Sequence, residues 1–342
     1  MGVALAACSA GPAPVVEEIH IFGSITQVEI RAAPPEQAQA AIAELSALLR
    51  QREREWHAWE PSDLTRINAA FAAGQPAKAP ASVVDLVARS KPLYAQSEGL
   101  FDPAVGGLVA AWGFHTSTYP VTTAVPADEA LAQWRAQRPH IDDVELEGDQ
   151  LRSSNARVQL DFGAIAEGAA AESAMAIFAR HGIEHALVSL GGDVMALGDG
   201  VGRPWQVALR DPFGGVLGGV ALRGGEALFS TGSYSKFRES PSGARWSHIL
   251  DPRTGRPARG AAAVVVLHTD PLLADAGATA LFVAGPAGFE RMARRMGLAC
   301  ALMVTEENEM MVTVALASRL ELLRDPVPLG KPLDLGPSCV VR

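Results

Sequence analysis

The order in which strand and helix patterns follow one another limits the folds open to this chain more than any other feature. Runs typical of β-strands cover residues 19–30, 158–162, 185–190, 205–209, 227–230, 262–267, 300–305 and 310–315. Helical spacing of apolar residues marks residues 36–53, 82–96, 128–135, 164–180, 270–284 and 287–296. These elements do not alternate in the regular strand–helix–strand order of a doubly wound sheet. The pattern therefore favours an α+β fold over a doubly wound sheet.

Composition excludes several classes of protein. The chain has 342 residues, of which 48% are hydrophobic and 20% charged, enough for a normal core. Its net charge is -9 and it has no run of Lys or Arg, so the electrostatic footprint of a nucleic-acid-binding protein is missing. The Walker and GxGxxG nucleotide motifs and the GxSxG elbow of hydrolases are absent as well.

The cysteines give limited information. There are three, Cys8, Cys300 and Cys339, too few for a disulfide-built scaffold and without a CxxC pair that would indicate structural zinc. The sequence leaves open whether Cys300 and Cys339 are free.

The amino terminus contains the run Leu5-Ala6-Ala7-Cys8, which resembles the lipobox at which bacterial lipoproteins are processed. The apolar stretch before Cys8 is only about five residues long, and no positive residue precedes it. We interpret residues 1–15 as a truncated lipoprotein signal and tether; the alternative is a frayed apolar tail. No run of about 18 or more apolar residues follows, so we expect no membrane-spanning segment.

Small residues dominate residues 160–168, Leu-Asp-Phe-Gly-Ala-Ile-Ala-Glu-Gly, where a predicted strand passes through Gly163 into a helix. The free N–H groups at the start of a helix favour a phosphate, and Gly163 and Gly168 allow close backbone approach. The alternative is tight packing of the helix against a neighbour through the same small residues.

Asp275 and Thr279 lie four positions apart in a predicted helix and therefore share one face. A carboxylate and a hydroxyl on one face can ligate a hard cation such as Mg²⁺, with phosphate oxygens and water completing the shell. An ordinary capping or surface pair is the alternative.

His248 immediately precedes a tight turn at residues 251–255, Asp-Pro-Arg-Thr-Gly. Histidine is the side chain best suited to proton transfer near neutral pH, and a strand end lets it point into a cleft. The alternative is a hydrogen-bonded structural histidine.

Two further segments are candidates for ligand contacts. Residues 230–234, Ser-Thr-Gly-Ser-Tyr, form a hydroxyl-rich turn that could donate to phosphate or merely cap a loop. Residues 99–103, Gly-Leu-Phe-Asp-Pro, are followed by Trp-Gly-Phe at residues 112–114, and the alternative there is a loop anchored by aromatic packing.

Taken together, in their order and spacing, these segments resemble the ApbE family of bacterial flavin transferases over about residues 21–315. The resemblance is carried by residues 22–24, 59–68, 101–103, 112–114, 161–168, 191–193, 230–234, 248–255 and 275–279. It implies an ApbE-like, T-fold-related α+β architecture of two packed lobes, with mixed or antiparallel sheets flanked by helices and FAD in the cleft between the lobes. The domain would span residues 16–325 and be followed by a proline-rich, loose tail at residues 326–342.

The resemblance also implies which residues form the site. Mg²⁺ is expected on Asp275, Thr279 and the backbone oxygen of Ala164, and the expected catalytic residues are His248 and Asp275. The expected FAD contacts come from most of the matching stretches: Phe22, Trp59, Leu100, Phe101, Asp102, Asp161, Glu167, Thr231, Gly232, His248 and Ile249.

The activity implied by the resemblance is Mg²⁺-dependent transfer of FMN from FAD to a Ser or Thr hydroxyl of an acceptor flavoprotein, with release of AMP. A FAD pyrophosphatase that uses water, and a periplasmic FAD-binding protein without catalysis, are the alternatives. The acceptors would be subunits of membrane redox complexes. A lipidated Cys8 would place the protein on the periplasmic side of a bacterial inner membrane.

Four departures from the family pattern concern the flavin pocket more than the metal. The usual Met-Gly-Thr is Phe-Gly-Ser at residues 22–24, and the usual Thr-Ser-Gly is Ser-Thr-Gly at residues 230–232. Trp59 replaces the usual Tyr or Phe, and Glu167 replaces a common Lys. These changes bear on substrate affinity more than on the chemistry.

Overall fold

The structure, a computed structural model of the chain, describes residues 12–239, 243, 245–324, 326–336 and 338–339. Cys8 and most of the expected tether lie outside the described residues. The main feature is a nine-stranded sheet in the order β1-β2-β6-β7-β10-β15-β16-β17-β19. Its neighbouring strands pair antiparallel, except that β17 and β19 run parallel. The strands are β1 (Val15–Ile21), β2 (Ser24–Arg31), β6 (His185–Leu190), β7 (Asp193–Leu197), β10 (Ala227–Gly232), β15 (Ala261–His268), β16 (Ala301–Thr305), β17 (Glu309–Val312) and β19 (Val327–Pro328).

Smaller sheets surround the large one. Two have three strands, in the orders β18-β9-β8 and β3-β5-β4, and two are two-stranded ribbons, β11-β12 and β13-β14. Their strands are β3 (Ala77–Lys78), β4 (Val144–Glu147), β5 (Gln150–Ser153), β8 (Trp205–Arg210), β9 (Val216–Leu222), β11 (Phe237–Glu239), β12 (Arg245–Ser247), β13 (Leu250–Asp251), β14 (Arg256–Pro257) and β18 (Leu320–Leu322).

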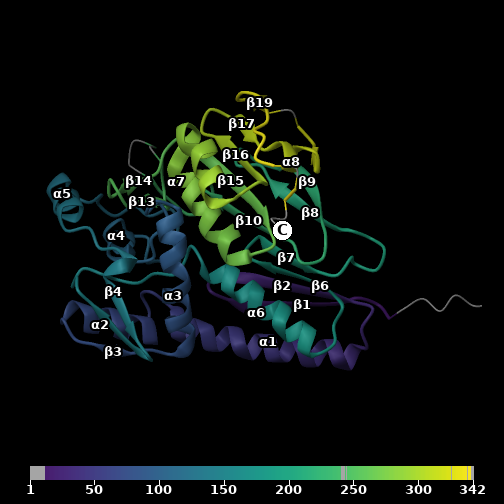
Figure 1. Cartoon of the computed structure of the whole chain (residues 1–342), viewed down its shortest axis with the longest axis horizontal. Helices are drawn as coiled ribbons and strands as arrows, with labels where there is room; N and C mark the ends of the chain where they lie inside the picture. Colours follow the sequence, from purple (N-terminus) through teal and green to yellow (C-terminus); the bar gives the residue numbers. More distant parts are fainter. Residues whose placement is uncertain (1–11, 240–242, 244, 325, 337, 340–342) are drawn as a thin grey trace, which may run out of the picture.

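The helices divide between two lobes (Figure 1). They are α1 (Pro35–Trp56), α2 (Asp63–Ala72), α3 (Ala81–Gln96), α4 (Gly106–Ala111), α5 (Asp128–Ala136), α6 (Ala166–Arg180), α7 (Pro271–Met296), α8 (Val314–Ala317) and the 3-10 helix η1 (Ile141–Asp143). In Figure 1, α1, α6 and α7 lie with the large sheet, whereas α2 to α5 gather with β3 and β4. One hydrophobic core includes Phe71 of α2, Leu86 of α3 and Phe282 of α7, so the lobes are packed together. The expected α+β architecture with mixed and antiparallel sheets is confirmed.

Helix α7 begins as its sequence predicts. Asp270 is the N-cap, and its Oδ1 accepts hydrogen bonds from the N–H groups of Leu272 and Leu273, while Pro271 occupies the first turn. At Gly285 the backbone leaves the helical region, with φ 63° and ψ -178°, and helix resumes after it. The two helices predicted over residues 270–284 and 287–296 are therefore the two arms of α7. The first arm packs on β10 and β15 and carries Asp275 and Thr279.

Three local expectations are corrected. Residues 158–162 form no named strand; the extended chain there makes a single bridge, between Gln159 and Val105. Asp128 is the first residue of α5 rather than its cap, which is Ala127. The tail after residue 325 is not loose, because β19 pairs with β17 and a disulfide joins Cys339 to Cys300.

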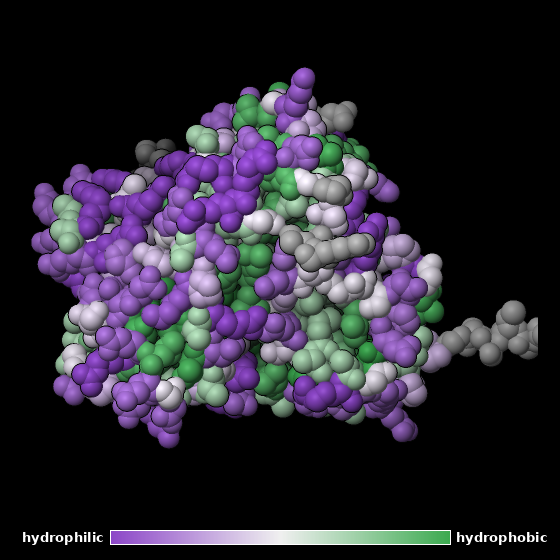
Figure 2. All heavy atoms as spheres, viewed as in Figure 1, coloured by the Kyte–Doolittle hydropathy of each residue, from purple (hydrophilic) through white to green (hydrophobic). Residues whose placement is uncertain are grey.

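Helix α7 alone, among the described residues, is long and apolar enough to resemble a membrane-crossing segment. Of its most apolar window, 67% is buried inside the fold, which is typical of a core helix. In the space-filling view of the same face, hydrophilic residues dominate and hydrophobic residues show through only in smaller patches (Figure 2). The apolar character of α7 therefore serves the core.

The disulfide between Cys300 and Cys339 should stabilise the fold because it closes a loop with a sequence separation of 39. We expect Cys339→Ser to lower the free energy of unfolding by about 2–4 kcal/mol, as measured by urea denaturation. A reductant should lower the stability of the wild-type protein to that of the variant and leave the variant unchanged. Equal stability of the oxidised wild-type protein and the variant would contradict this role.

Candidate active site

Asp275, one of the metal ligands expected from the sequence, lies where α6 begins beside the first arm of α7. Gly168, in the first turn of α6, donates its N–H to Oδ2 of Asp275 at 2.9 Å. The helices approach so closely there that a Cβ on Gly168 would lie 2.6 Å from the carbonyl oxygen of Pro271. The packing interpretation of the small residues in 160–168 is thus confirmed, whereas phosphate binding stays a prediction.

This contact also affects Ala164. The Gly168 N–H, which could otherwise bond to the Ala164 carbonyl within the first turn, is used by Asp275. Among the described residues, the Ala164 carbonyl oxygen accepts no hydrogen bond. An unpartnered carbonyl is the kind of oxygen that a hard cation can take as a ligand.

Thr279 lies one helical turn beyond Asp275, and its hydroxyl faces the hydroxyl of Thr231 at 3.4 Å between the oxygens. Thr231 belongs to the end of β10, on which α7 packs. Asp275 is only 6% exposed, which excludes the interpretation of this pair as an ordinary surface pair. The site therefore gathers a buried carboxylate and two hydroxyls from α7 and β10.

Three carboxyl groups share this region. Burial raises the pKa of Asp275 well above its ordinary value, and the charges of Glu167 and Asp193 raise it further. Burial and Glu167 likewise raise the pKa of Asp193, although Ser230 donates two hydrogen bonds to its Oδ1. Burial raises the pKa of Glu167 too, opposed mainly by the positive charge of Lys236. Such a cluster is stabilised by added positive charge.

These donors fit Mg²⁺ better than a transition metal. Within the described part of the chain, no three His, Cys, Asp or Glu side chains are grouped so as to hold a metal by themselves. Asp275, Thr279 and the Ala164 carbonyl supply only hard oxygen atoms and leave positions for phosphate oxygens and water, as Mg²⁺ prefers.

An aromatic pair, Trp59 and His115, lies next to the carboxylate of Asp161. The ring of Trp59, 41% exposed, stacks on His115 with centroids 5.2 Å apart and an interplanar angle of 20°. His115 Nε2 is 3.2 Å from Oδ2 of Asp161, and Asp161 Oδ1 accepts a hydrogen bond from the Gly163 N–H. A partly exposed indole is a suitable surface for a planar ring system. Sequence reasoning missed His115, although it directly follows the Trp-Gly-Phe of residues 112–114.

His248 lies directly after β12, with its ring edge-on to Phe114 at 6.2 Å between centroids. Its Nδ1 is 2.9 Å from the Lys236 carbonyl oxygen, which can only accept, so we assign the ring proton to Nδ1. Burial, with the charge of Lys236, lowers the pKa of His248 to about 4. At neutral pH the imidazole is therefore uncharged, and its Nε2 is the basic nitrogen.

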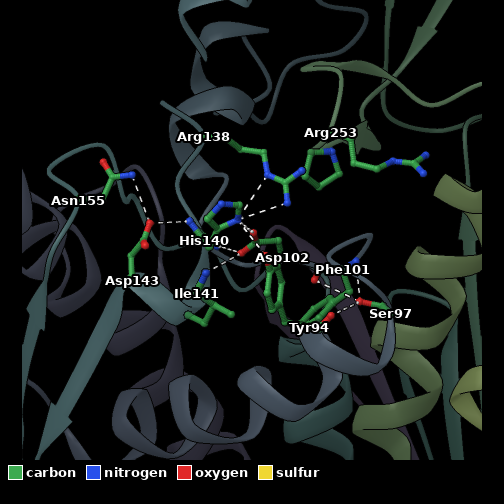
Figure 3. A network of polar contacts seen from close by, with 12 residues as sticks. Tyr94, Ser97, Phe101, Asp102, Arg138, His140, Ile141, Asp143, Asn155 and Arg253 are labelled. Carbon is green, nitrogen blue, oxygen red and sulfur yellow. Dashed lines mark hydrogen bonds and ion pairs between the residues drawn. The ribbon is translucent and has the colours of Figure 1, made fainter. Parts of the chain in front are cut away.

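The loop at residues 100–102 has buried side chains. Leu100, Phe101 and Asp102 are 2%, 1% and 5% exposed, and the FAD contact expected of this loop stays a prediction. Asp102 Oδ1 accepts from the N–H groups of Ala104 and Ile141, and burial raises its pKa to about 7. Figure 3 shows this carboxyl enclosed by the loop and neighbouring polar residues.

Only backbone atoms of this loop remain for a ligand. The loop is joined to the site by a backbone hydrogen bond, in which the Pro103 carbonyl oxygen accepts the N–H of Asp161.

The remaining expected contacts occupy the rim and the interior. Phe22 is half-buried and stacks on Trp56. The turn between β1 and β2 that contains Phe22 lies beside the Gly191–Gly192 turn, because β2 pairs with β6. Gly232 lies against the ring of Tyr234, where a Cβ would come within 2.2 Å. Ile249 is 7% exposed, so its side chain packs in the core.

Comparison with known proteins agrees with this fold. The ApbE family profile matches residues 22–302, and the chain belongs to the ApbE family. It is 45% identical over 319 residues to the FAD:protein FMN transferase of Rhodobacter capsulatus, which covers 93% of this chain. The chain spans only 60% of the length of that relative.

Two other similarities cover most of both proteins. The FAD:protein FMN transferase of Klebsiella pneumoniae (strain 342) is 31% identical over 291 residues, or 83% of each chain. The apo crystal structure of the flavinyl transferase ApbE of Pseudomonas stutzeri superimposes with a TM-score of 0.77 at 30% identity, covering 90% of this chain and 97% of that one.

The raised pKa of Asp275 gives a test of metal binding that does not need turnover. Folding takes up a proton there, so without metal this group destabilises the fold increasingly as the pH rises above the ordinary carboxyl value of 3.8. Asp275→Asn removes the charge and keeps an oxygen for the Gly168 N–H. We expect the metal-free variant to melt above the wild-type protein at pH 8, but to lose the rise in Tm that MgCl₂ with ADP causes in the wild-type protein.

The matched control is Asp149→Asn, which removes an exposed carboxylate and should preserve the Mg²⁺ response. Retention of the full Mg²⁺-dependent shift by Asp275→Asn would eliminate Asp275 as a ligand.

Proposed function

We propose that this protein is a Mg²⁺-dependent FAD:protein FMN transferase, which attaches FMN from FAD to a Ser or Thr hydroxyl of an acceptor flavoprotein and releases AMP. The observation that carries the proposal is the continuity of the site. Asp275 is bonded to Gly168 at the start of α6 and feels the charge of Glu167, while Asp161 on the preceding turn contacts His115, on which Trp59 stacks. Membership of the ApbE family and the names of its relatives support the same activity.

The two ends of this row suit two parts of the substrate, the isoalloxazine ring and the diphosphate. The stacked rings of Trp59 and His115 offer a surface for the isoalloxazine ring. Asp275, Thr279 and the Ala164 carbonyl would hold Mg²⁺ near the diphosphate. When bound, the ion would neutralise negative charge on the phosphate oxygens.

His248 is the proposed base. Its Nδ1–H is directed at the Lys236 carbonyl, which fixes the ring and leaves Nε2 to accept the proton of the acceptor hydroxyl. The hydroxyl oxygen attacks the phosphorus on the FMN side, and the bond from that phosphorus to the bridging oxygen breaks. AMP leaves with the electron pair, and the proton passes from Nε2 to AMP or water. A pKa of about 4 keeps His248 ready as a base across the neutral range.

The test incubates the purified protein with FAD, MgCl₂ and candidate acceptor flavoproteins, and follows flavin fluorescence on the acceptor band in a denaturing gel. Labelled acceptor together with an equal amount of AMP is the expected result. Free FMN and AMP without labelling would instead establish the pyrophosphatase alternative, and intact FAD would establish a binding protein.

We also propose that the protein is exported and acts on the periplasmic side of a bacterial membrane, anchored there by a lipid on Cys8. The disulfide between Cys300 and Cys339 supports an oxidising compartment, because such bonds persist there and are rare in the cytosol. Acceptors in membrane redox complexes would be within reach of such an anchored enzyme.

The lowered pKa of His248 predicts a pH-dependent stability. Because the folded protein resists protonating this ring, its contribution is complete above pH 6.5 and is lost as the pH falls towards about 4. His248→Gln should flatten the loss of Tm between pH 6.5 and 4, while kcat for FMN transfer drops about 100-fold or more. His20→Gln, an exposed histidine on β1, is the control that should change neither quantity. Unchanged kcat in His248→Gln would refute the role as base.

A further inference from the structure

A hollow of about 540 Å³ lies at the ends of β8 and β10 and along β12. It is lined by the loop that follows β8, by Ser233 and Tyr234, by the whole of β12 and by Arg259. The loop contributes Phe213, whose side chain is 54% exposed, and the glycines Gly214 and Gly215. The hollow is therefore an open groove with a broad rim.

Two backbone segments belong to both the groove and the site. Strand β12 lines the groove with Arg245, Trp246 and Ser247, and the next residue is His248. On the neighbouring segment, Thr231 and Gly232 belong to the expected FAD contacts, and Ser233 and Tyr234 line the groove. The lining of the groove is consequently only one residue along the backbone from the proposed base, His248.

The charge of the groove is opposite to that of the protein. Arg210, Arg245 and Arg259 line it, although the chain has a net charge of -9. Arg210 lies over the ring of Tyr234 at 4.6 Å from the centroid and forms no ion pair with an acidic side chain among the described residues. Among the described residues, the ion pairs of Arg245 and Arg259 are long, to Glu239 at 3.4 Å and Glu306 at 3.8 Å. Arg259 also donates a hydrogen bond to the Arg245 carbonyl oxygen, and Arg245 lies over the ring of Phe237.

The acidic residues that line the groove already have basic partners. Asp211 is paired with Arg324, which lowers the pKa of its carboxyl group. Glu306 is the partner of Arg259. The positive charge of Arg210 therefore remains available, beside the aromatic rings of Tyr234 and Trp246. Arginine and aromatic side chains together are typical of the energetically important centres of protein interfaces.

We propose that this groove binds the acceptor polypeptide, as an extended acidic segment with an apolar residue near the Ser or Thr that receives FMN. The proposal rests on the proposed function. The carboxylates of the acceptor segment would contact Arg210 and Arg245, and its apolar side chain would lie against Trp246 and Phe213. Its hydroxyl would extend past Ser247 to His248. Recognition in this groove is separate from FAD binding, which takes place along Trp59, Asp161 and Asp275.

The test measures binding directly, so that it does not depend on turnover. The probe is a fluorescein-labelled peptide of about twelve residues with one Thr between Asp and Leu residues, and its Kd is measured by fluorescence anisotropy without FAD, so that no FMN transfer occurs. We expect Arg210→Glu/Arg245→Glu to weaken peptide binding about tenfold or more. The Kd for FAD, measured by quenching of flavin fluorescence, should not change.

Three controls sharpen the result. Arg50→Glu, an exposed arginine on α1, should bind the peptide as the wild-type protein does. A peptide with Lys in place of Asp should bind at least tenfold more weakly. If the charge-reversed protein has a lowered Tm, Arg210→Gln/Arg245→Gln replaces it.

Absence of peptide binding, equal binding of the Lys peptide, or an equal loss of FAD affinity would overturn the proposal; the last would make the groove part of the FAD site. Peptide binding through the groove without FMN transfer would instead count against the proposed function alone.

Discussion

The hydrogen bond from the Gly168 N–H to the Asp275 carboxylate is the interaction on which the rest of the site depends. It forms because a residue without a side chain lets the start of α6 lie against α7, where a Cβ would come within 2.6 Å of the Pro271 carbonyl. The same contact buries Asp275, brings Glu167 to it, and takes away the N–H that the Ala164 carbonyl would use. One backbone contact thus sets the position of the Asp275 carboxylate at the start of α6.

The electrostatics of this arrangement explain why it suits a cation and a diphosphate. Asp275, Glu167 and Asp193 repel one another in a region where burial raises all three pKa values. Lys236 is the one positive side chain in the described structure that lowers any of them. A protein that only needed stability would place apolar residues there, because buried unpaired charges are costly. The unbalanced charge is understandable if a metal ion completes the site, because the bound cation would offset the free energy that it costs to bury these acids.

Much of the fold could be predicted from the sequence, because Asp270, Pro271 and the apolar spacing specify α7 locally. The shared face of Asp275 and Thr279 follows from helical spacing alone. Contacts across the chain could not be predicted in this way: the stacking of Trp59 on His115 joins residues 56 positions apart, and no local pattern marks it. Nor does the sequence show that the side chains of Phe101 and Asp102 are buried, since a loop has no periodic pattern that separates buried from exposed positions. The pairing of Cys300 with Cys339 likewise depends on where β16 and the tail meet.

The central claim is that a divalent cation binds between the turn before α6 and the first arm of α7. Crystals grown with Mn²⁺ and FAD would locate the ion by its anomalous scattering. The account predicts one peak within about 2.5 Å of an Asp275 carboxylate oxygen, the Thr279 hydroxyl and the Ala164 carbonyl oxygen, with diphosphate oxygens on its open side. A peak bound instead by Glu167 and Asp193, with Asp275 still bonded only to Gly168, would contradict it.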